Sequence, residues 1–229
     1  MKADGKQVSR WHTFANPLEL ERAATRIVLA SAQQAIAERG AFRCVLAGGN
    51  TPRALYGSLC NAVTDWRAWT LYFGDERCVP AADPSRNSRM AGDAWLDRVA
   101  IPPRQIHAIP AELGPELGAI SYAEALAGVG AFDLVLLGLG EDGHTASLFP
   151  GRDWERSTTW PDAIPVHDSP KPPPQRVSLS PARLSHSLKV LYLVVGEDKR
   201  DAVNAWQAGH PLPASRICPP GGVDVLMHL

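Results

Sequence analysis

The pattern of apolar and polar residues is clearest just past the middle of the chain, in FDLVLLGLGEDGHTASLFPG, residues 132–151. The apolar run from Phe132 to Leu137 stops at glycines, which is typical of a strand buried on both faces at the centre of a parallel sheet. Ligands in open α/β sheets lie just beyond the carboxyl ends of such strands. We therefore expect chemistry on the loop after this strand, which carries Asp142 and His144.

Helical and extended patterns alternate along the rest of the chain. The clearest helix covers 16–39, where Asn16 can cap the first turn, Pro17 suits that turn and Gly40 follows the last one. Further helices are expected at about 51–60, 90–99, 121–129 and 197–208, and further strands at 42–47, 70–73, 106–110, 176–179, 190–195 and 222–229. This alternation predicts an α/β fold with a doubly wound, mainly parallel sheet flanked by helices, a modified Rossmann-like arrangement. No clear boundary divides the chain, so we expect a single domain over residues 1–229.

A proline-rich segment interrupts the alternation at 161–175. Its PKPPP run, residues 170–174, has a PxxP spacing that is compatible with a docking motif. A stiff surface connector is the simpler interpretation.

Composition excludes some partners. The 229 residues are 45% apolar and 21% charged, which is ordinary for a globular chain long enough to bury a core. A net charge of −1 gives no steering toward nucleic acid or an anionic membrane, so an anionic ligand must be held by local cations. The stretch 1–14 lacks the apolar core of a signal peptide, and no run approaches the length of a membrane span.

The cysteines favour a reducing compartment. No two of them form a CxxC pair, and a disulfide framework is not expected at this chain length. The four are Cys44, Cys60, Cys78 and Cys218. We therefore expect a cytoplasmic protein. The sequence leaves the oligomeric state open, with a monomer as the expectation.

A Gly-Gly turn follows the strand at 42–47. Gly48 and Gly49 would let backbone N–H groups approach an anion, and the following helix adds partial positive charge. Thr51 is a good N-cap for that helix and Pro52 a good first residue, with Asn50 between the glycines and the cap. The Gly-Lys-Ser/Thr ending of a Walker A loop is missing. A phosphate-binding loop and a plain capped turn remain equal alternatives at this point.

The loop at 138–143 also matches G-x-G-x-x-G, the dinucleotide fingerprint. We reject that interpretation because the match lies past mid-chain and because Pro150 and Gly151 leave no room for the long helix that it should open. Glu141 and Asp142 would also repel a pyrophosphate there. No histidine pair at i, i+4 or cysteine cluster indicates a metal site, and the Gly-x-Ser-x-Gly elbow of serine hydrolases is absent.

Asp142, Gly143 and His144 make more sense as an acid–base unit. The glycine allows a sharp turn, and histidine is the side chain whose protonation changes nearest working pH. The alternative is a histidine that only caps a short following helix. The segment Asp75-Glu76-Arg77, at the end of another strand, is more simply a structural salt-bridge cluster when taken alone.

Four segments together resemble the 6-phosphogluconolactonase family, which is related to glucosamine-6-phosphate deaminases. They are AGGNTP (47–52), GDERCVP (74–80), GLGEDGHTASLFPG (138–151) and RVSLSPARL (176–184). The third is the specific one, and the similarity extends over about 16–215. The resemblance implies hydrolysis of 6-phospho-D-glucono-1,5-lactone in the pentose phosphate pathway without a cofactor. It implies that His144 is the catalytic base and that Asp75 and Asp142 belong to the catalytic site.

The resemblance also implies a phosphate site built from the loop 48–51 and three cations. The cations are Arg77, Arg176 and Lys199. The chain departs from the family where Ser-Asn-Tyr is common and residues 86–88 read Arg-Asn-Ser, and where Ala47 replaces the usual serine. These departures concern substrate contacts more than the reaction.

Two rival functions share this pattern. A sugar-phosphate isomerase/deaminase carries Asn-Glu-Pro after its Asp-Gly-His loop, whereas this chain has Leu148-Phe149-Pro150 and lacks that carboxylate. A non-enzymatic sugar-phosphate sensor would have no need of His144, and such sensors usually carry a DNA-binding segment for which 229 residues leave no room.

Overall fold

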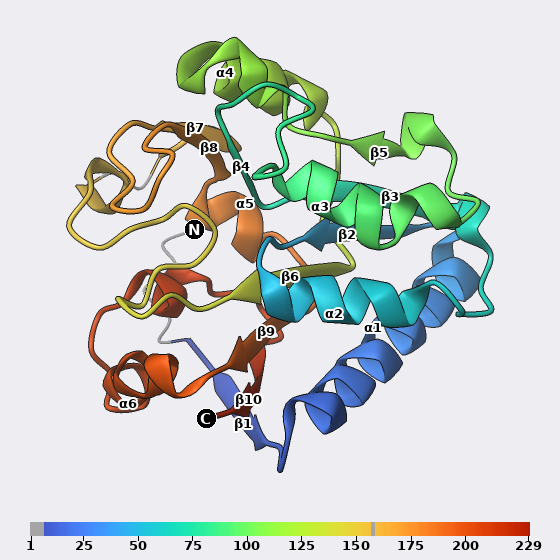
Figure 1. Ribbon diagram of the computed structural model, residues 1–229, viewed down its shortest axis with the longest axis horizontal. Coiled ribbons are helices and arrows are strands. Elements are labelled where there is room, and N and C mark those ends of the chain that lie inside the picture. Colours follow the sequence, from blue (N-terminus) through green and yellow to red (C-terminus); the bar gives the residue numbers. More distant parts are fainter. Residues whose placement is uncertain (1–6, 157–158) are drawn as a thin grey trace.

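A seven-stranded parallel sheet runs through the middle of the structure, a computed structural model that describes residues 7–156 and 159–229 (Figure 1). From edge to edge its strands are β1 (Ser9–Thr13), β10 (Val223–His228), β9 (Val190–Val195), β6 (Leu134–Gly138), β2 (Phe42–Leu46), β3 (Trp69–Phe73) and β5 (Ile106–His107). Every neighbouring pair is parallel. The predicted α/β fold with a mainly parallel, doubly wound sheet is confirmed.

The strand order reverses beside β6. The chain places β2, β3 and β5 toward one edge, then returns to set β6 beside β2 and continues toward the other edge with β9 and β10. Residues 134–137 of β6 are fully buried, as expected of the central strand. The loops after β2 and β6 therefore leave the same end of the sheet at its switch point, where α/β proteins bind ligands.

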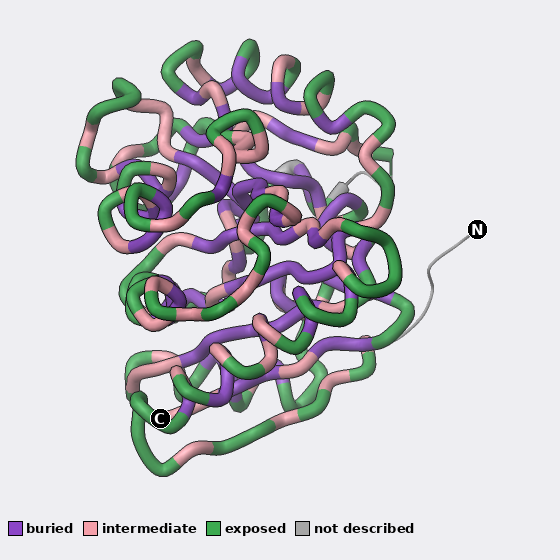
Figure 2. Tube along the Cα trace, turned by 90° about the vertical axis from the view of Figure 1, so that its right-hand side faces the viewer, coloured by how far each residue is buried: buried purple, intermediate pink, exposed green. Residues whose placement is uncertain are grey.

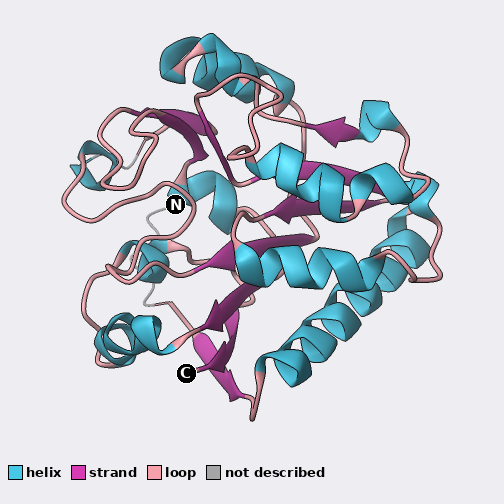
Figure 3. Ribbon diagram, in the orientation of Figure 1, coloured by secondary structure: helices cyan, strands magenta, loops and turns pink. Residues whose placement is uncertain are grey.

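Three helices follow the first strands. They are α1 (Pro17–Arg39), α2 (Asn50–Leu59) and α3 (Asn87–Ala94). The predicted caps of α1 are confirmed, because Asn16 Oδ1 accepts the Glu19 N–H at 2.9 Å and Gly40 has φ 72°. α1 and α2 pack on each other and against the sheet, and α3 packs on α2. In Figure 3 the helices α2 and α3 pass in front of the strands.

The predicted cap of α2 is wrong. The helix begins at Asn50 rather than after Thr51, and its N-cap is Gly49, with φ 103° and no side-chain cap. The glycine takes the sharp change of direction at a backbone conformation that Thr51 could adopt only with strain.

A second sheet of three antiparallel strands stands beside the first. It consists of β4 (Asp75–Arg77), β8 (Arg176–Leu179) and β7 (Ala163–Val166), in that order. Helix α4 (Pro115–Ala125) packs against β7 and β8. The sequence predicts β8 but assigns it to no separate sheet, and it predicts neither β4 nor β7. Both missed strands are three or four residues long, too short for a period-2 pattern to show.

Other boundaries differ in instructive ways. The helix expected at 121–129 is α4, which begins earlier at Gly114-Pro115 because glycine turns the chain and proline suits the first helical position. The helix expected at 90–99 is α3 followed by a 3-10 turn, Leu96–Arg98. Two further helices are α5 (Pro181–Ser185) and α6 (Arg200–Gln207). The remaining 3-10 turns are Trp66–Ala68, Pro103–Gln105, Ala111–Leu113, Asp153–Arg156, Glu197–Lys199 and Pro213–Arg216.

The core lies along the strands and the inward faces of the helices, as the burial colours of Figure 2 show. Its largest members include Trp69, Trp95 and Tyr56, whose rings contact one another in a fully buried cluster. Burying one such side chain stabilises the fold by roughly 1.5–3 kcal/mol. No helix in the described part of the chain has the length and hydropathy needed to cross a bilayer. The first six residues of the N-terminal stretch lie outside the described residues.

Candidate active site

The loop after β6 fixes His144 through backbone bonds. The Gly140 N–H donates to the His144 carbonyl at 2.8 Å, and the Gly143 N–H donates to the Gly140 carbonyl at 3.0 Å. A Cβ at Gly140 would lie 1.9 Å from His144 Nδ1, so only glycine lets the imidazole lie against this turn. The glycines that interrupt the apolar pattern thus provide the turn and the space that His144 occupies.

Asp142 and His144, which the sequence predicts to be an acid–base unit, are hydrogen-bonded to each other. His144 Nδ1 lies 2.5 Å from Asp142 Oδ1, which also accepts the His144 backbone N–H at 3.1 Å. Burial alone would raise the pKa of Asp142, but the hydrogen bond and charge of the imidazole and the backbone N–H bonds outweigh it and bring this pKa to about 2. The ionised carboxylate favours the tautomer with the proton on Nδ1, which leaves the Nε2 lone pair able to accept a proton.

An apolar ring forms the buried side of His144. The Phe149 ring lies 4.6 Å from the imidazole, measured between centroids, and is itself fully buried. The guanidinium carbon of Arg176 lies 5.6 Å from the centre of the same ring. No helix forms between 141 and 150, so the alternative in which His144 only caps a following helix is wrong. The His144 side chain keeps 17% of its surface exposed.

Asp75 lies buried at the start of β4 rather than on an open loop. Its Oδ2 accepts the Ser147 hydroxyl at 2.5 Å, and its Oδ1 accepts the Asn87 side-chain amide at 3.0 Å. A Cβ at Gly48 would lie 2.0 Å from Asn87 Oδ1, so Gly48 makes room for this amide. Asp75 therefore connects the loop after β2, helix α3 and the loop of His144.

The sequence does not predict Asn87 and Ser147 as partners of Asp75. They stand 12 and 72 positions from Asp75, and no spacing rule links a buried carboxylate to partners that tertiary packing supplies. Asn87 lies in the segment 86–88, where the chain departs from the family, and Ser147 lies in the segment 138–151, which carries the resemblance.

Glu76 has a structural role. Its carboxylate accepts the backbone N–H groups of Asn87 at 2.7 Å and Ser88 at 2.8 Å, and thereby caps α3, which has no side-chain cap of its own. Glu76 also pairs with the buried Arg86 at 3.2 Å. The salt-bridge interpretation of this segment is correct for Glu76.

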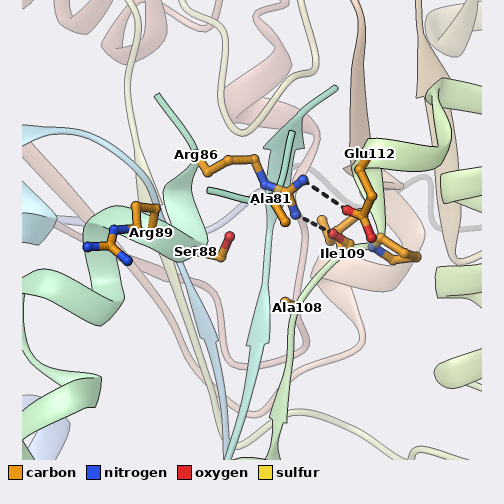
Figure 4. Close-up of a pocket in the computed structure, with 8 residues that line it drawn as sticks. Ala81, Arg86, Ser88, Arg89, Ala108, Ile109 and Glu112 are labelled. Atoms are coloured by element: carbon orange, nitrogen blue, oxygen red, sulfur yellow. Dashed lines mark hydrogen bonds and ion pairs between the residues drawn. The ribbon is translucent and has the colours of Figure 1, made fainter. Parts of the chain in front are cut away.

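The departure at Arg86 has the same structural account. Its guanidinium donates to the Ile109 carbonyl at 2.7 Å and to Glu112 Oε2 at 3.0 Å, as Figure 4 shows. These contacts close one wall of a hollow of about 360 Å³ beside α3, which Arg89 also lines. None of the predicted site residues lines this hollow, so it is separate from the loop of His144.

Two arginines stand opposite each other on the small sheet. Arg77 of β4 pairs with Arg176 of β8 in the antiparallel ladder, and directly opposed like charges are destabilising. Arg176 is buried, donates to the Lys171 carbonyl at 2.9 Å, and has a lowered pKa because of that burial. Arg77 donates to the Ser85 carbonyl, and its buried Nε has no protein partner. Among the described residues neither arginine forms an ion pair with a carboxylate. The pair is therefore suited to an anion.

Lys199 ends the 3-10 turn after β9 and lies close to the loop of His144. Its Nζ is 2.7 Å from Asp198 Oδ2 and 4.0 Å from Glu141 Oε1. Glu141 also pairs with Lys171 of the proline-rich segment at 2.8 Å. One ion pair thus joins the proline-rich segment to the loop of His144.

The loop 48–51 stands at the switch point beside the loop of His144. It comprises Gly48, Gly49 with φ 103°, and the first two residues of α2, of which Asn50 is exposed. The first N–H groups of a helix have no partner within the helix and carry partial positive charge, which is the property that an anion site needs. Within the described ranges, no group of three His, Cys, Asp or Glu side chains is placed to hold a metal ion.

The chain is similar to known proteins in both sequence and structure. Residues 15–226 match the family model for glucosamine-6-phosphate isomerases/6-phosphogluconolactonase. A 6-phosphogluconolactonase of Streptomyces coelicolor is 40% identical over 204 residues, which covers 81% of this chain and 77% of the relative. The crystal structure of a Thermotoga maritima 6-phosphogluconolactonase superposes with a TM-score of 0.88 at 26% identity, covering 96% of this chain and 99% of the other. A monomeric glucosamine-6-phosphate deaminase gives a TM-score of 0.81 at 21% identity over 95% and 96%, which shows a shared fold alone.

Proposed function

Because the chain belongs to the family of glucosamine-6-phosphate isomerases and 6-phosphogluconolactonases, we propose that it hydrolyses 6-phospho-D-glucono-1,5-lactone to 6-phospho-D-gluconate, the lactonase step of the pentose phosphate pathway. The observation that carries the proposal is the Asp142–His144 pair on the loop after the central strand, close to the buried Arg176, which faces the half-buried Arg77. Such a site offers a base at one end and cations at the other. A lactone that bears a phosphate requires both.

In this mechanism His144 is the general base. Its Nε2 takes a proton from water while the water oxygen attacks the lactone carbonyl carbon. Negative charge builds on the carbonyl oxygen, for which loop N–H groups are the candidate donors. When the tetrahedral intermediate collapses, the bond to the ring oxygen breaks and that oxygen takes the proton from Nε2. Asp142 holds the tautomer throughout and stabilises the imidazolium that forms.

The phosphate is held by cations on the small sheet and around β9. Arg77 and Arg176 oppose each other in the ladder, and a dianion between them would offset their repulsion. Lys199 and the N–H groups of the loop 48–51 complete the set that we propose. Because the phosphate is remote from the carbonyl, these contacts act before and during the reaction alike.

The deaminase alternative is disfavoured by what stands beside the base. Phe149 occupies the position of the carboxylate that the deaminase motif carries, and its ring packs on His144. We expect ammonia release from glucosamine 6-phosphate to be undetectable beside lactone hydrolysis. Ammonia assayed with glutamate dehydrogenase at a rate comparable to lactone turnover would contradict this assignment.

We also propose that the protein acts as a cytoplasmic monomer. All four cysteines are free thiols, which suits a reducing compartment. Light scattering coupled to gel filtration measures the mass directly, and a mass near 49 kDa, twice the 24.7 kDa of the chain, would replace the monomer with a dimer.

One assay tests the reaction. Purified protein is mixed with freshly prepared phosphogluconolactone, and 6-phosphogluconate dehydrogenase reports the product through NADPH. His144→Ala protein at the same concentration tests the base separately, and the same mixture without protein is the control for spontaneous hydrolysis. A wild-type rate no faster than that control would overturn the proposed function.

A further inference from the structure

A buried serine ties the loop of His144 to the small sheet. Ser147 has no exposed surface, and its hydroxyl donates to Asp75 Oδ2 at 2.5 Å. The other oxygen of Asp75 accepts from Asn87, so the protein engages both carboxylate oxygens. We infer that Ser147 and Asp75 are positioning residues, which act on the reaction through His144 instead of touching the substrate. This inference rests on the proposed function.

The residue before Ser147 explains why the loop needs this bond. Ala146 has φ 48° and is the one non-glycine residue with positive φ among the described residues. A side chain makes this left-handed conformation less stable than the right-handed one, so neighbouring contacts must hold it. On the N-terminal side of Ala146, the Thr145 hydroxyl fixes the loop by donating to the Gly138 carbonyl at 2.9 Å. On the C-terminal side of Ala146, the Ser147 hydroxyl fixes the loop by donating to Asp75.

The bond also spans the two sheets. His144 and Ser147 belong to the loop of the parallel sheet, whereas Asp75 starts β4, two residues before Arg77. Arg77 in turn faces Arg176 across the ladder. The Ser147–Asp75 bond therefore sets the distance between the base and the cations proposed for the phosphate. The rate of a reaction depends on how the protein positions the reacting groups, and a displacement of about 1 Å can lower it roughly 100-fold.

A direct catalytic role for Asp75 is the competing explanation. It predicts that Asp75 faces the substrate, but the Asp75 residue is only 7% exposed and its oxygens face Ser147 and Asn87. The two explanations also differ in energetics. Two residues that act through one bond lose that bond only once, so their effects do not multiply.

A double-mutant cycle separates them. Ser147→Ala and Asp75→Asn are each expected to lower kcat by about 10-fold or more, with KM within about threefold of wild type, because ground-state phosphate contacts survive. The kcat of the double variant is expected to be no lower than that of the less active single variant. Losses that multiply, or a Ser147→Ala protein with kcat within twofold of wild type, would overturn the inference. Binding of 6-phosphogluconate by calorimetry corrects every kcat for the folded fraction.

A rescue experiment covers variants that fold poorly. Ala146→Gly removes the side chain that disfavours the left-handed conformation, so adding it to Ser147→Ala or to Asp75→Asn is expected to raise kcat at least threefold. A carboxylate lost from direct catalysis could not be rescued by a backbone change, so the absence of recovery in both backgrounds would overturn the inference.

Ser187→Ala is the matched control, since Ser187 is also a buried serine but donates to the Leu184 carbonyl. An equal loss in this control would assign the effect to general destabilisation. Failure of wild-type protein to hydrolyse the lactone would instead overturn the proposed function, and this inference with it.

Discussion

Replacing Asp142 with asparagine tests the acid–base pair without changing its shape. The carboxylate holds His144 Nδ1 at 2.5 Å and carries a full negative charge, because its pKa is about 2. Asparagine keeps the size of the side chain but loses the charge. Its amide can also donate to Nδ1, which places the imidazole proton on Nε2, the atom that must accept it.

The size of the effect follows from the pair itself. The pKa of Asp142 falls from an ordinary 3.8 to about 2 through hydrogen bonds and the imidazole charge, against burial that raises it. That fall corresponds to roughly 2.4 kcal/mol. Since 39% of the Asp142 side chain is exposed, solvent screening leaves about 1 kcal/mol for stabilising the imidazolium, or roughly fivefold in rate. Population of the wrong tautomer adds to this, so we expect kcat to fall by about 10- to 50-fold.

The lactone assay measures this directly, with KM expected to stay within about threefold because the phosphate contacts are untouched. Denaturant unfolding supplies a second measurement. Because the folded pKa of Asp142 lies below the unfolded one, its ionised form stabilises the fold above about pH 4, and this contribution is lost as the pH falls toward 2. The free energies of unfolding of wild type and Asp142→Asn should therefore converge in that window. If the Asp142→Asn protein binds 6-phosphogluconate at full stoichiometry, and so is folded, a wild-type kcat would refute the proposal that Asp142 orients His144.

Three other substitutions probe the same site. His144→Ala should lower kcat by ~10²-fold or more while 6-phosphogluconate binding changes little, and a folded variant with near wild-type kcat would falsify the base assignment. Lys199→Ala should lower kcat/KM on phosphogluconolactone by on the order of 10- to 100-fold but leave unphosphorylated gluconolactone unaffected; equal loss on both substrates removes Lys199 from the phosphate site. Gly140→Ala should abolish turnover, since its Cβ would lie 1.9 Å from His144 Nδ1, whereas Gly130→Ala, with open space around it, serves as the control; an active Gly140→Ala protein would show that the loop shifts freely.

The parts of the fold that sequence alone predicts are those with a local physical signal. The central strand at β6 and the caps of α1 rest on apolar runs and on residues with one strong backbone preference. Strand β1 has no such signal, because SRWHT is polar and mostly exposed. It forms by pairing with β10, and the contact of Trp11 with Trp206 supports it from the other end of the chain.

The candidate site divides in the same way. Asp142 and His144 lie two residues apart on one turn, so a local motif predicts their contact. The partners of Asp75 come from α3 and from the loop after β6, and only the packing of two sheets brings them together. The opposition of Arg77 and Arg176 likewise depends on the register of strands 99 positions apart.

The placement of β6 beside β2 has a consequence for folding. The two strands meet through the pairs Cys44 with Leu134 and Val45 with Val135, which close a loop of 90 residues. Closing so long a loop is entropically slow compared with forming helices or neighbouring strands. The anion loop and the base loop come together only at that step, so a refolding chain regains turnover no earlier than this pairing. Return of lactonase activity therefore reports when this long-range pairing of β2 with β6 has formed.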